Sequence, residues 1–217
     1  IIFFLSLFIF NLNLNAEEFD ITAKEILIDK ENEIIIGKGS VQAVDSEGKL
    51  INADKITYEK SREFLLVEGK VKITDIYGNI LETNKATYDK INEIIITYDN
   101  TRLMLEGYDL ITKNISYNTE KKILSSNENS VFSDSDGNII ETNMFHYDIK
   151  NNLFSSIGKI KITDIKKNKY FFKELHVDTR NKEMIGSDVS VILDQENFGV
   201  SKESDPRFIS NDIFISK

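Results

Sequence analysis

The stretch Asn52–Glu59, with the sequence NADKITYE, decides the fold because the chain repeats its pattern at a nearly constant interval. Close copies occupy residues 82–89, 111–118 and 141–148, and looser copies occupy residues 22–29 and 171–178. The last apolar residue of each copy falls at position 28, 58, 88, 117, 147 or 177, so the copies are 30, 30, 29, 30 and 30 residues apart. Such a regular period predicts stacked copies of one supersecondary unit.

Each repeat contains two segments with the pattern of β-strands. Within residues 53–58, Asp54, Ile56 and Tyr58 alternate with the residues between them, and this period of two is typical of a strand. A polar turn follows, and then a second run rich in aromatic and aliphatic residues, such as residues 64–67 (FLLV). Six copies predict about twelve strands, the tail adds one or two, and no stretch keeps the apolar period of about 3.6 residues that a helix needs.

Glycine and aspartate mark where these strands bend and turn. Gly39, Gly69 and Gly158 each lie 11 residues after the last apolar residue of a copy, which predicts a bulge or tight bend inside the strand. Segments such as residues 134–138 (DSDGN) predict the second turn of the unit. The predicted fold is therefore all-β, with about 12–14 antiparallel strands built from repeats that must stack to bury their apolar faces.

Composition limits the classes of function. The 217 residues are 41% hydrophobic and 29% charged, which predicts a folded core in one or at most two domains. The chain has no Cys, so neither a disulfide nor a thiolate metal site supports the fold. The net charge of -9 argues against a nucleic-acid partner and against electrostatic docking on anionic lipid, because both depend on Lys and Arg.

The ends of the chain depart from the repeat. Residues 1–16 begin with a nearly uninterrupted apolar run and end at Ala16, which predicts a signal peptide truncated at its start. A transmembrane anchor is the alternative, but the run is shorter than the roughly 20 residues that a spanning helix needs. Residues 17–200 are assigned to one continuous repeat domain, and residues 201–217, which stop in mid-pattern, to the start of a following segment.

Catalytic and metal-binding motifs are weak. His146 and His176 share one repeat position, where Thr or Ser stands in other copies, so an outward polar position is the simpler interpretation. The segment 134–138 resembles a calcium loop only superficially, because it lacks the spacing and the flanking helices of such a loop. No nucleophile motif, phosphate loop or dinucleotide fingerprint is present. The sequence therefore predicts a protein that is not an enzyme and has no cofactor and no metal site.

The remaining signal is a row of apolar residues along the repeat. We expect this row to face inward, with Lys55, Thr57, His146 and His176 facing outward. The row fills a core if two sheets meet, and becomes an elongated apolar groove if they splay. The candidate lipid-binding residues are Ile26, Ile28, Ile56, Tyr58, Ala86, Tyr88, Ile115, Tyr117, Phe145, Tyr147, Leu175 and Val177.

The unit from Gly69 to Tyr88, with the pattern GxVxIxDxxGxxxxxNKATY, resembles the OstA-like repeat of lipopolysaccharide-transport proteins. This family includes the periplasmic bridge protein LptA and the N-terminal domain of the outer-membrane protein LptD. The resemblance covers roughly residues 19–194. The segment Asp205–Arg207 resembles the one by which LptD leaves this domain for its membrane β-barrel. Ile28 and Val177 depart from the pattern, because other copies have Tyr at this position.

The resemblance implies a β-jellyroll of two splayed antiparallel sheets. Its interior would carry the acyl chains of lipopolysaccharide, which belong to the lipid A part of that molecule. It also implies end-to-end strand pairing with other jellyroll transport proteins, in the periplasm of a Gram-negative bacterium and attached to or part of the outer membrane. The N-terminal domain of an LptD-type protein, with an outer-membrane lipoprotein as partner, is the first interpretation. A free-standing LptA-like bridge is the second, and a β-solenoid adhesin or structural surface protein is the alternative from another class.

Overall fold

The computed structural model describes residues 19–46, 48–105, 107–194 and 206–216. Within these ranges the chain is all β, apart from the short 3-10 turn η1 (Lys60–Arg62), and every strand pairing is antiparallel. The predicted fold class is confirmed. The predicted signal peptide, residues 1–16, lies outside the described residues.

The described residues form eighteen strands, all in one sheet. They are β1 (Phe19–Thr22), β2 (Glu25–Asp29), β3 (Ile34–Asp45), β4 (Leu50–Glu59), β5 (Phe64–Thr74), β6 (Ile80–Asp89), β7 (Ile94–Tyr98), β8 (Thr101–Leu105), β9 (Tyr108–Thr112), β10 (Ser116–Asn118), β11 (Ile123–Ser126), β12 (Ser130–Asp134), β13 (Ile139–Thr142), β14 (Phe145–Asp148), β15 (Leu153–Thr163), β16 (Lys169–Asp178), β17 (Glu183–Ile192) and β18 (Arg207–Ile215).

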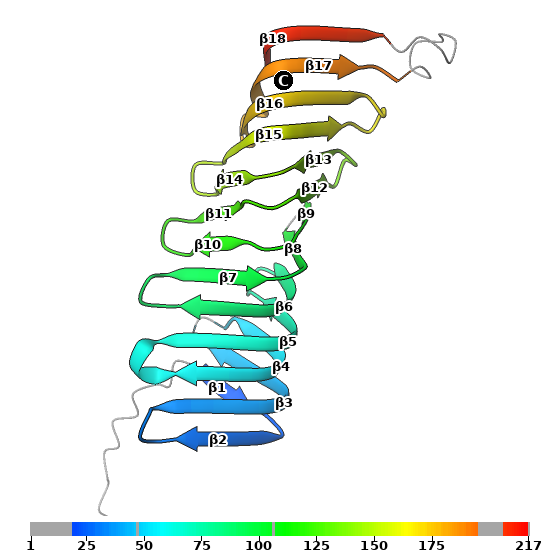
Figure 1. Cartoon of the computed structure of the whole chain (residues 1–217). Coiled ribbons are helices and arrows are strands. Elements are labelled where there is room, and N and C mark those ends of the chain that lie inside the picture. The colour runs from blue at the N-terminus through cyan, green and yellow to red at the C-terminus, as the bar shows by residue number, and fades with distance from the viewer. Residues whose placement is uncertain (1–18, 47, 106, 195–205, 217) are drawn as a thin grey trace, which may run out of the picture.

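Many of these strands are halves of one longer rung. For example, β3 pairs through Ile34–Lys38 with β2 and through Gln42–Asp45 with β1, so β1 and β2 together span one neighbour. The pairs β7 and β8, β9 and β10, β11 and β12, and β13 and β14 are related in the same way. Because five rungs consist of two short strands each, the 18 strands make 13 rungs, stacked in chain order (Figure 1). The described residues therefore form more strands than the predicted 12–14, because five of the rungs are each broken into two strands, although the number of rungs lies within that range.

Every rung bends near its middle. In β3 the two residues Gly39 and Ser40 lie opposite the single residue Asp54 of β4, which is a β-bulge. Equivalent register shifts occur at Gly69 and Gly158, and these glycines have φ of +78° and +111°. A Cβ at Gly69 would also lie 2.5 Å from the carboxylate of Asp54, so a side chain there would clash. The bulges predicted at these glycines are confirmed.

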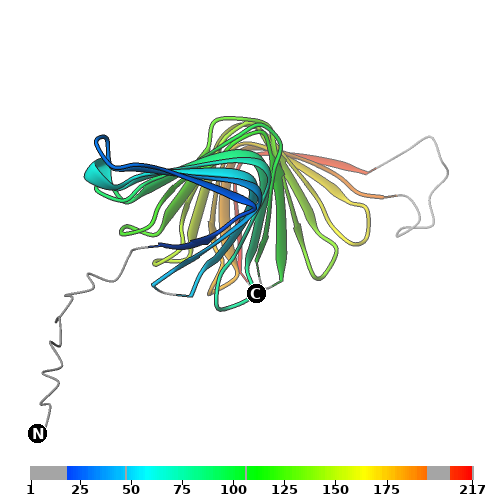
Figure 2. The ribbon, with the colours of Figure 1, turned by 90° about the horizontal axis from the view of Figure 1, so that it is seen from below.

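The aligned bends form a crease from which two arms diverge (Figure 2). We call one the tyrosine arm; it comprises β2, β7, β10, β11, β14 and the adjoining halves of the long strands. We call the other the leucine arm; it comprises β1, β8, β9, β12, β13 and the remaining halves. The two splayed sheets that were predicted are these two arms of one continuous, creased sheet.

The turns at the tips of the tyrosine arm share one side-chain device. At Asp89, one carboxylate oxygen accepts a hydrogen bond from the backbone N–H of Asn92 (3.0 Å) and the other from the Asn92 Nδ2 (2.7 Å). These bonds lower the pKa of the Asp89 carboxyl below its ordinary value, the side-chain bond from Asn92 contributing most. The same arrangement recurs at Asp29 with Asn32, Asp148 with Asn151 and Asp178 with Asn181, where the pKa is also lowered.

The tips of the leucine arm use a related turn. Asp134 accepts hydrogen bonds from the backbone N–H of Asn138 and from its Nδ2, both at 2.8 Å. Asp75 with Asn79 and Asp164 with Asn168 repeat this geometry. The segment 134–138 is therefore a repeat turn between β12 and β13, as predicted, with its leading carboxylate occupied by hydrogen bonds.

The last described strand extends the sheet beyond the predicted domain boundary at residue 200. β18 pairs with β17 along its length, from Arg207 opposite Ile192 to Ile215 opposite Met184. The segment assigned to the start of a following region therefore supplies the thirteenth rung. Its alternation resembles that of the repeat strands, which is why it fits the same register.

The Asp turns predict acid sensitivity. Their folded-state pKa values lie below the ordinary 3.8, so their stabilisation is present above the unfolded pKa and is lost as the pH falls through the folded values. The Asn92→Ala variant should raise the pKa of Asp89 toward 3.8 and reduce the loss of stability between about pH 5 and pH 2. Carboxyl NMR titration and urea unfolding measure both effects. Asn84→Ala, an exposed change on the same strand, is the control, and an unchanged Asp89 titration in Asn92→Ala would contradict the argument.

Candidate functional site

An apolar row runs along the inner face of the tyrosine arm through all 13 rungs. Because the registers are continuous from rung to rung, each member lies directly opposite the next. Its members are Ile28, Ile35, Tyr58, Leu65, Tyr88, Ile95, Tyr117, Leu124, Tyr147, Phe154, Val177, Met184 and Ile215. We call this row the tyrosine ladder.

The leucine arm carries a matching row. Its members are Ile21, Ala43, Ile51, Ile73, Leu81, Leu103, Leu110, Phe132, Ile140, Ile162, Tyr170, Val191 and Phe208. We call it the leucine ladder. The two ladders face one another, because the ring of Phe132 contacts Phe145 and Phe154 of the opposite arm at centroid distances of 4.7 and 5.2 Å.

The structure places the predicted site residues on this interior. The tyrosine ladder contains six of them: Tyr58, Tyr88, Tyr117, Tyr147, Ile28 and Val177. Five more line the same arm nearer the crease and are at most 3% exposed: Ile56, Ala86, Ile115, Phe145 and Leu175. Ile26 and Ile28 point to the same side but are 45% and 62% exposed, because they lie on the edge rung. The predicted inward orientation is confirmed, whereas lipid binding by these residues stays a prediction.

The two histidines lie on the outer face, as predicted. Ser155 separates them, with His146 opposite it on one side and His176 on the other. The ring of His176 is held by Ser155 Oγ at Nδ1 and by a carboxylate oxygen of Glu174 at Nε2, both at 3.0 Å. Within the described ranges, no group of three or more His, Cys, Asp or Glu could hold a metal ion.

The interior between the arms is hollow over much of its length. Three cavities of about 170, 360 and 580 Å³ follow one another along the stack. The first two share Leu103 and Leu124, and the last two share Phe132 and Val177, so they form one groove. This groove runs from Ile73 toward Ile215. Its walls are mainly the two apolar ladders.

Polar groups are confined to the rims of the groove. The hydroxyl of Tyr147 is 3.2 Å from Thr179 Oγ1 beside the turn, and that of Tyr170 donates to Asp164 at 3.0 Å. Burial, followed by this bond to the Asp164 carboxylate, raises the pKa of Tyr170. The tyrosines therefore present apolar ring faces to the groove and polar tips to the rim, an arrangement that suits an amphiphile.

A feature that the sequence interpretation missed is a seam of buried hydroxyls at the crease. Thr97 Oγ1 accepts hydrogen bonds from the backbone N–H of Ile115 (2.9 Å) and from Thr101 Oγ1 (2.7 Å). The hydroxyl oxygens of Thr142 and Ser156 are 2.5 Å apart, and the carbonyl oxygen of Met144 lies 2.9 and 2.8 Å from them, so this carbonyl and one of the hydroxyls accept hydrogen bonds here. The seam consists of Thr83, Thr97, Thr101, Thr112, Ser126, Ser130, Thr142 and Ser156.

The hydroxyl seam compensates for the interrupted rungs. Where a strand breaks at the crease, backbone groups leave the ladder and need other partners. The hydroxyls supply these partners, and among the described residues no buried side-chain nitrogen or oxygen lacks a hydrogen bond. The signal in the sequence was the recurrence of Thr83, Thr112 and Thr142 at one repeat position.

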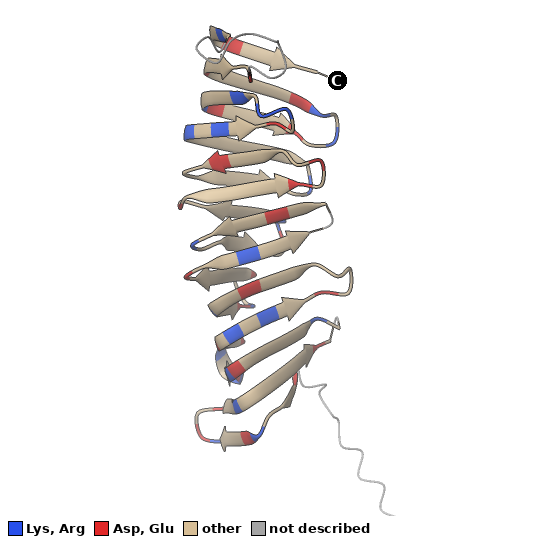
Figure 3. Cartoon of the chain, turned by 90° about the vertical axis from the view of Figure 1, so that its right-hand side faces the viewer, with Lys and Arg blue, Asp and Glu red and all other residues tan. Residues whose placement is uncertain are grey.

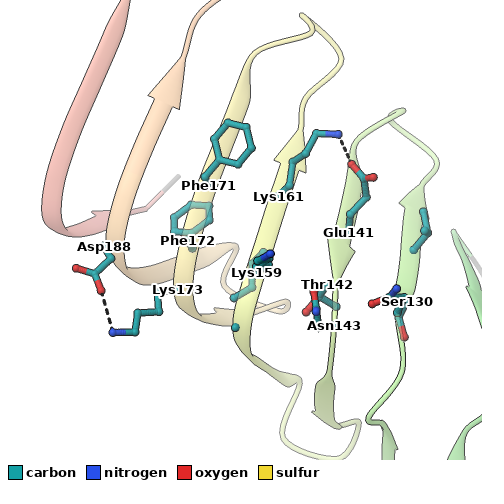
Figure 4. A pocket seen from close by; sticks show the side chains of 14 residues that line it. Ser130, Glu141, Thr142, Asn143, Lys159, Lys161, Phe171, Phe172, Lys173 and Asp188 are labelled. Carbon is teal, nitrogen blue, oxygen red and sulfur yellow. Dashed lines mark hydrogen bonds and ion pairs between the residues drawn. The ribbon is translucent and has the colours of Figure 1, made fainter.

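The outer face is different in character. Basic and acidic residues occur on neighbouring strands (Figure 3), and they form cross-strand pairs such as Arg102 with Asp109 at 2.7 Å. A hollow of about 680 Å³ on this face lies on β12, β13 and β15–β17. Figure 4 shows that two of its lysines are paired, Lys161 with Glu141 and Lys173 with Asp188. This hollow has neither the length nor the apolar walls of the interior groove.

Comparisons with known proteins add a distant likeness. No family model and no curated protein matches the chain. One solved structure with a similar arrangement is LptH from Pseudomonas aeruginosa, described as the LptA-homologous periplasmic component of the lipopolysaccharide transport device. The identity is 15%, the match covers 49% of this chain and 79% of LptH, and the TM-score is 0.45.

No helix in the part of the chain that the structure describes is long and apolar enough to cross a membrane.

The hydroxyl seam generates a stability prediction. Thr97 is fully buried, and Thr97→Val would leave the N–H of Ile115 without its side-chain acceptor. Such a buried unsatisfied group costs about 1–3 kcal/mol, so the free energy of unfolding should fall by that amount in urea titrations. Thr87→Val, on the outer face of the preceding rung, should change it by no more than about 0.5 kcal/mol. Equal stability of the two variants would contradict a structural role for the seam.

Proposed function

We propose that this chain carries the acyl chains of lipopolysaccharide along its interior groove, as a non-catalytic conduit. The observation that carries the proposal is the pair of apolar ladders, which face each other through 13 rungs and enclose connected cavities. A core that only stabilised the fold would pack these walls together. Here Tyr117, Tyr147 and Val177 remain partly exposed to the hollow.

The energetics suit a sliding ligand. Each methylene kept from water is worth about 0.8 kcal/mol, so moving ten methylenes into an aqueous space would cost about 8 kcal/mol. A continuous apolar wall avoids this cost at each step, because neighbouring positions along the ladders are similar. The outer face offers no comparable path for an alkyl chain, because its charged side chains form ion pairs with one another.

Both ends of the stack support strand pairing with other jellyroll transport proteins. In the described part of the chain, β2 pairs only with β3, and β18 pairs only with β17. β2 is exposed along its whole length, and Phe208, Ile209 and Phe214 of β18 are at least 59% exposed. Open edges of this kind accept an added strand, which would prolong the groove into a partner.

Within this transport function we favour the N-terminal domain of an LptD-type protein, with an outer-membrane lipoprotein as a further partner. The sequence resemblance of Asp205–Arg207 to a segment of LptD supports this assignment, and Arg207 itself begins β18 and still belongs to the sheet. A free-standing LptA-like bridge has the same groove and edges and is the main alternative. The proposed location is the periplasm of a Gram-negative bacterium, with the chain attached to or part of the outer membrane. The DNA sequence downstream of Lys217 distinguishes them, because an early stop codon would favour the bridge.

Site-specific photo-crosslinking in cells tests the conduit. A photoreactive residue at Tyr117, which lines the groove, should capture lipopolysaccharide during active transport. The same residue at Thr87, on the outer face of the same arm, should not. Equal labelling at both positions, or none in a transport-competent cell, would favour the adhesin or structural interpretation instead.

A charge in the groove should block transport. Tyr117→Asp places an unpaired carboxylate among Leu103, Ile115 and Leu124, where alkyl chains would have to pass. We expect loss of lipid labelling at a second groove position, Tyr147, while Tyr117→Phe should keep it. Circular dichroism and thermal melting establish that both variants remain folded. Undiminished labelling in a folded Tyr117→Asp protein would contradict passage through the groove.

A further inference from the structure

The interior is open in one part of the stack and filled in another. The three groove cavities begin near Ile73 and continue toward the C-terminal rung. Nearer the N-terminal rung, the ladder residues Ile51, Tyr58 and Leu65 line none of these three cavities. The ladders are apolar in both parts, so chemistry alone does not explain why one part is filled.

The difference coincides with one aromatic side chain on the edge rung. Phe19, the first residue of β1, belongs to the leucine arm and pairs with Asp45 near the arm's tip. Its ring contacts the ring of Tyr58 on the opposite arm edge to face, with centroids 5.2 Å apart. Phe19 thus bridges the two arms where the groove would otherwise reach the N-terminal end of the stack.

Phe19 is unusual among the residues of its rung. It is 5% exposed, whereas Asp20 and Thr22 are exposed and every residue of β2 is exposed. Within the described ranges β1 is held by hydrogen bonds to β3 on one side only. An edge strand with pairing on one side is the part of a sheet that separates most easily. The buried ring is therefore carried by a weakly held strand.

The opposite end of the stack provides a comparison. Phe208 lies on the other edge strand, β18, in the leucine ladder, but its side chain is 59% exposed. The hollow beside this end is lined by Ile215, Met184 and Val177 and is open. An aromatic residue on an edge strand therefore does not by itself close the groove; the inward position of Phe19 against Tyr58 does.

We propose that the N-terminal part of the interior is a second site for an alkyl chain, which the side chain of Phe19 occupies in place of the ligand. Withdrawal of Phe19 would uncover Ala43, Ile51 and Tyr58 and extend the groove to the end of the stack. Phe19 then determines how far along the stack an acyl chain reaches. This inference rests on the proposed function, because it takes the groove to bind alkyl chains.

NMR with laurate as the probe, below its critical micelle concentration, tests the inference on the full chain. The protein carries protonated isoleucine methyl groups in a deuterated background. In the wild type, intermolecular NOEs should connect laurate with Ile140, which lines two of the cavities, but not with Ile51. In Phe19→Ala a new NOE to Ile51 should appear, and the number of laurate molecules bound should increase.

Two further variants make the result specific. Phe214→Ala removes a phenylalanine from the outer face of the other edge strand, outside both ladders, and should behave as the wild type. Phe19→Leu keeps an apolar residue of smaller volume and replaces Phe19→Ala in the NOE experiment if Phe19→Ala unfolds the first rungs. Amide hydrogen exchange in β3 and β4 would reveal such unfolding. It should also give the NOE to Ile51, with lower intensity than Phe19→Ala.

The outcomes separate the two proposals. NOEs to Ile140 but none to Ile51 in both Phe19 variants would overturn the second site and leave the conduit intact. An NOE to Ile51 already in the wild type would overturn the blocking role of Phe19. Absence of NOEs to either methyl group in every protein would overturn alkyl binding by the groove, and the inference with it.

Discussion

The structure depends on one constraint, the antiparallel register that places each residue opposite the equivalent position of the neighbouring rung. Tyr58 lies between Ile35 and Leu65, and Tyr147 lies between Leu124 and Phe154. Because the repeat length stays near 30 residues, this matching continues along the stack without slipping. A slip of one residue would turn every inward side chain outward, so the apolar ladders and the register stabilise each other.

The crease is the second requirement, because a flat sheet of this length would expose one apolar face. Bulges at Gly39, Gly69 and Gly158 bend the continuous rungs at a common position. The central rungs break instead, and buried hydroxyls then bond the backbone groups that the broken ladder leaves, as Thr97 does for Ile115. Two local solutions therefore produce one continuous bend, and the apolar faces of both arms turn toward each other.

Side-chain volume then decides how much of the interior remains open. Phe19 against Tyr58 fills the N-terminal part, and Phe132 against Phe145 and Phe154 narrows the middle without separating the cavities on either side. The outer face has little effect on how much of the interior is open, because its charged side chains pair across strands and stay in water. The same sheet thus combines an interior filled by side chains at one end with a groove over the rest.

The sequence alone determined the strands, the bulges, the repeat turns and the inward direction of residues such as Tyr58 and Tyr147. These features depend on local alternation and on a fixed period, and both are visible in the order of the residues. Only the tertiary structure decided that the arms enclose a groove, that hydroxyls line the crease, and that β18 joins the sheet. The physical reason is that these features depend on which side chains meet across rungs or across arms. Phe132 and Phe154 are distant in sequence and meet because of the angle between the arms, whereas Thr97 and Ile115 meet because the register of β7 with β10 brings them opposite each other at the crease.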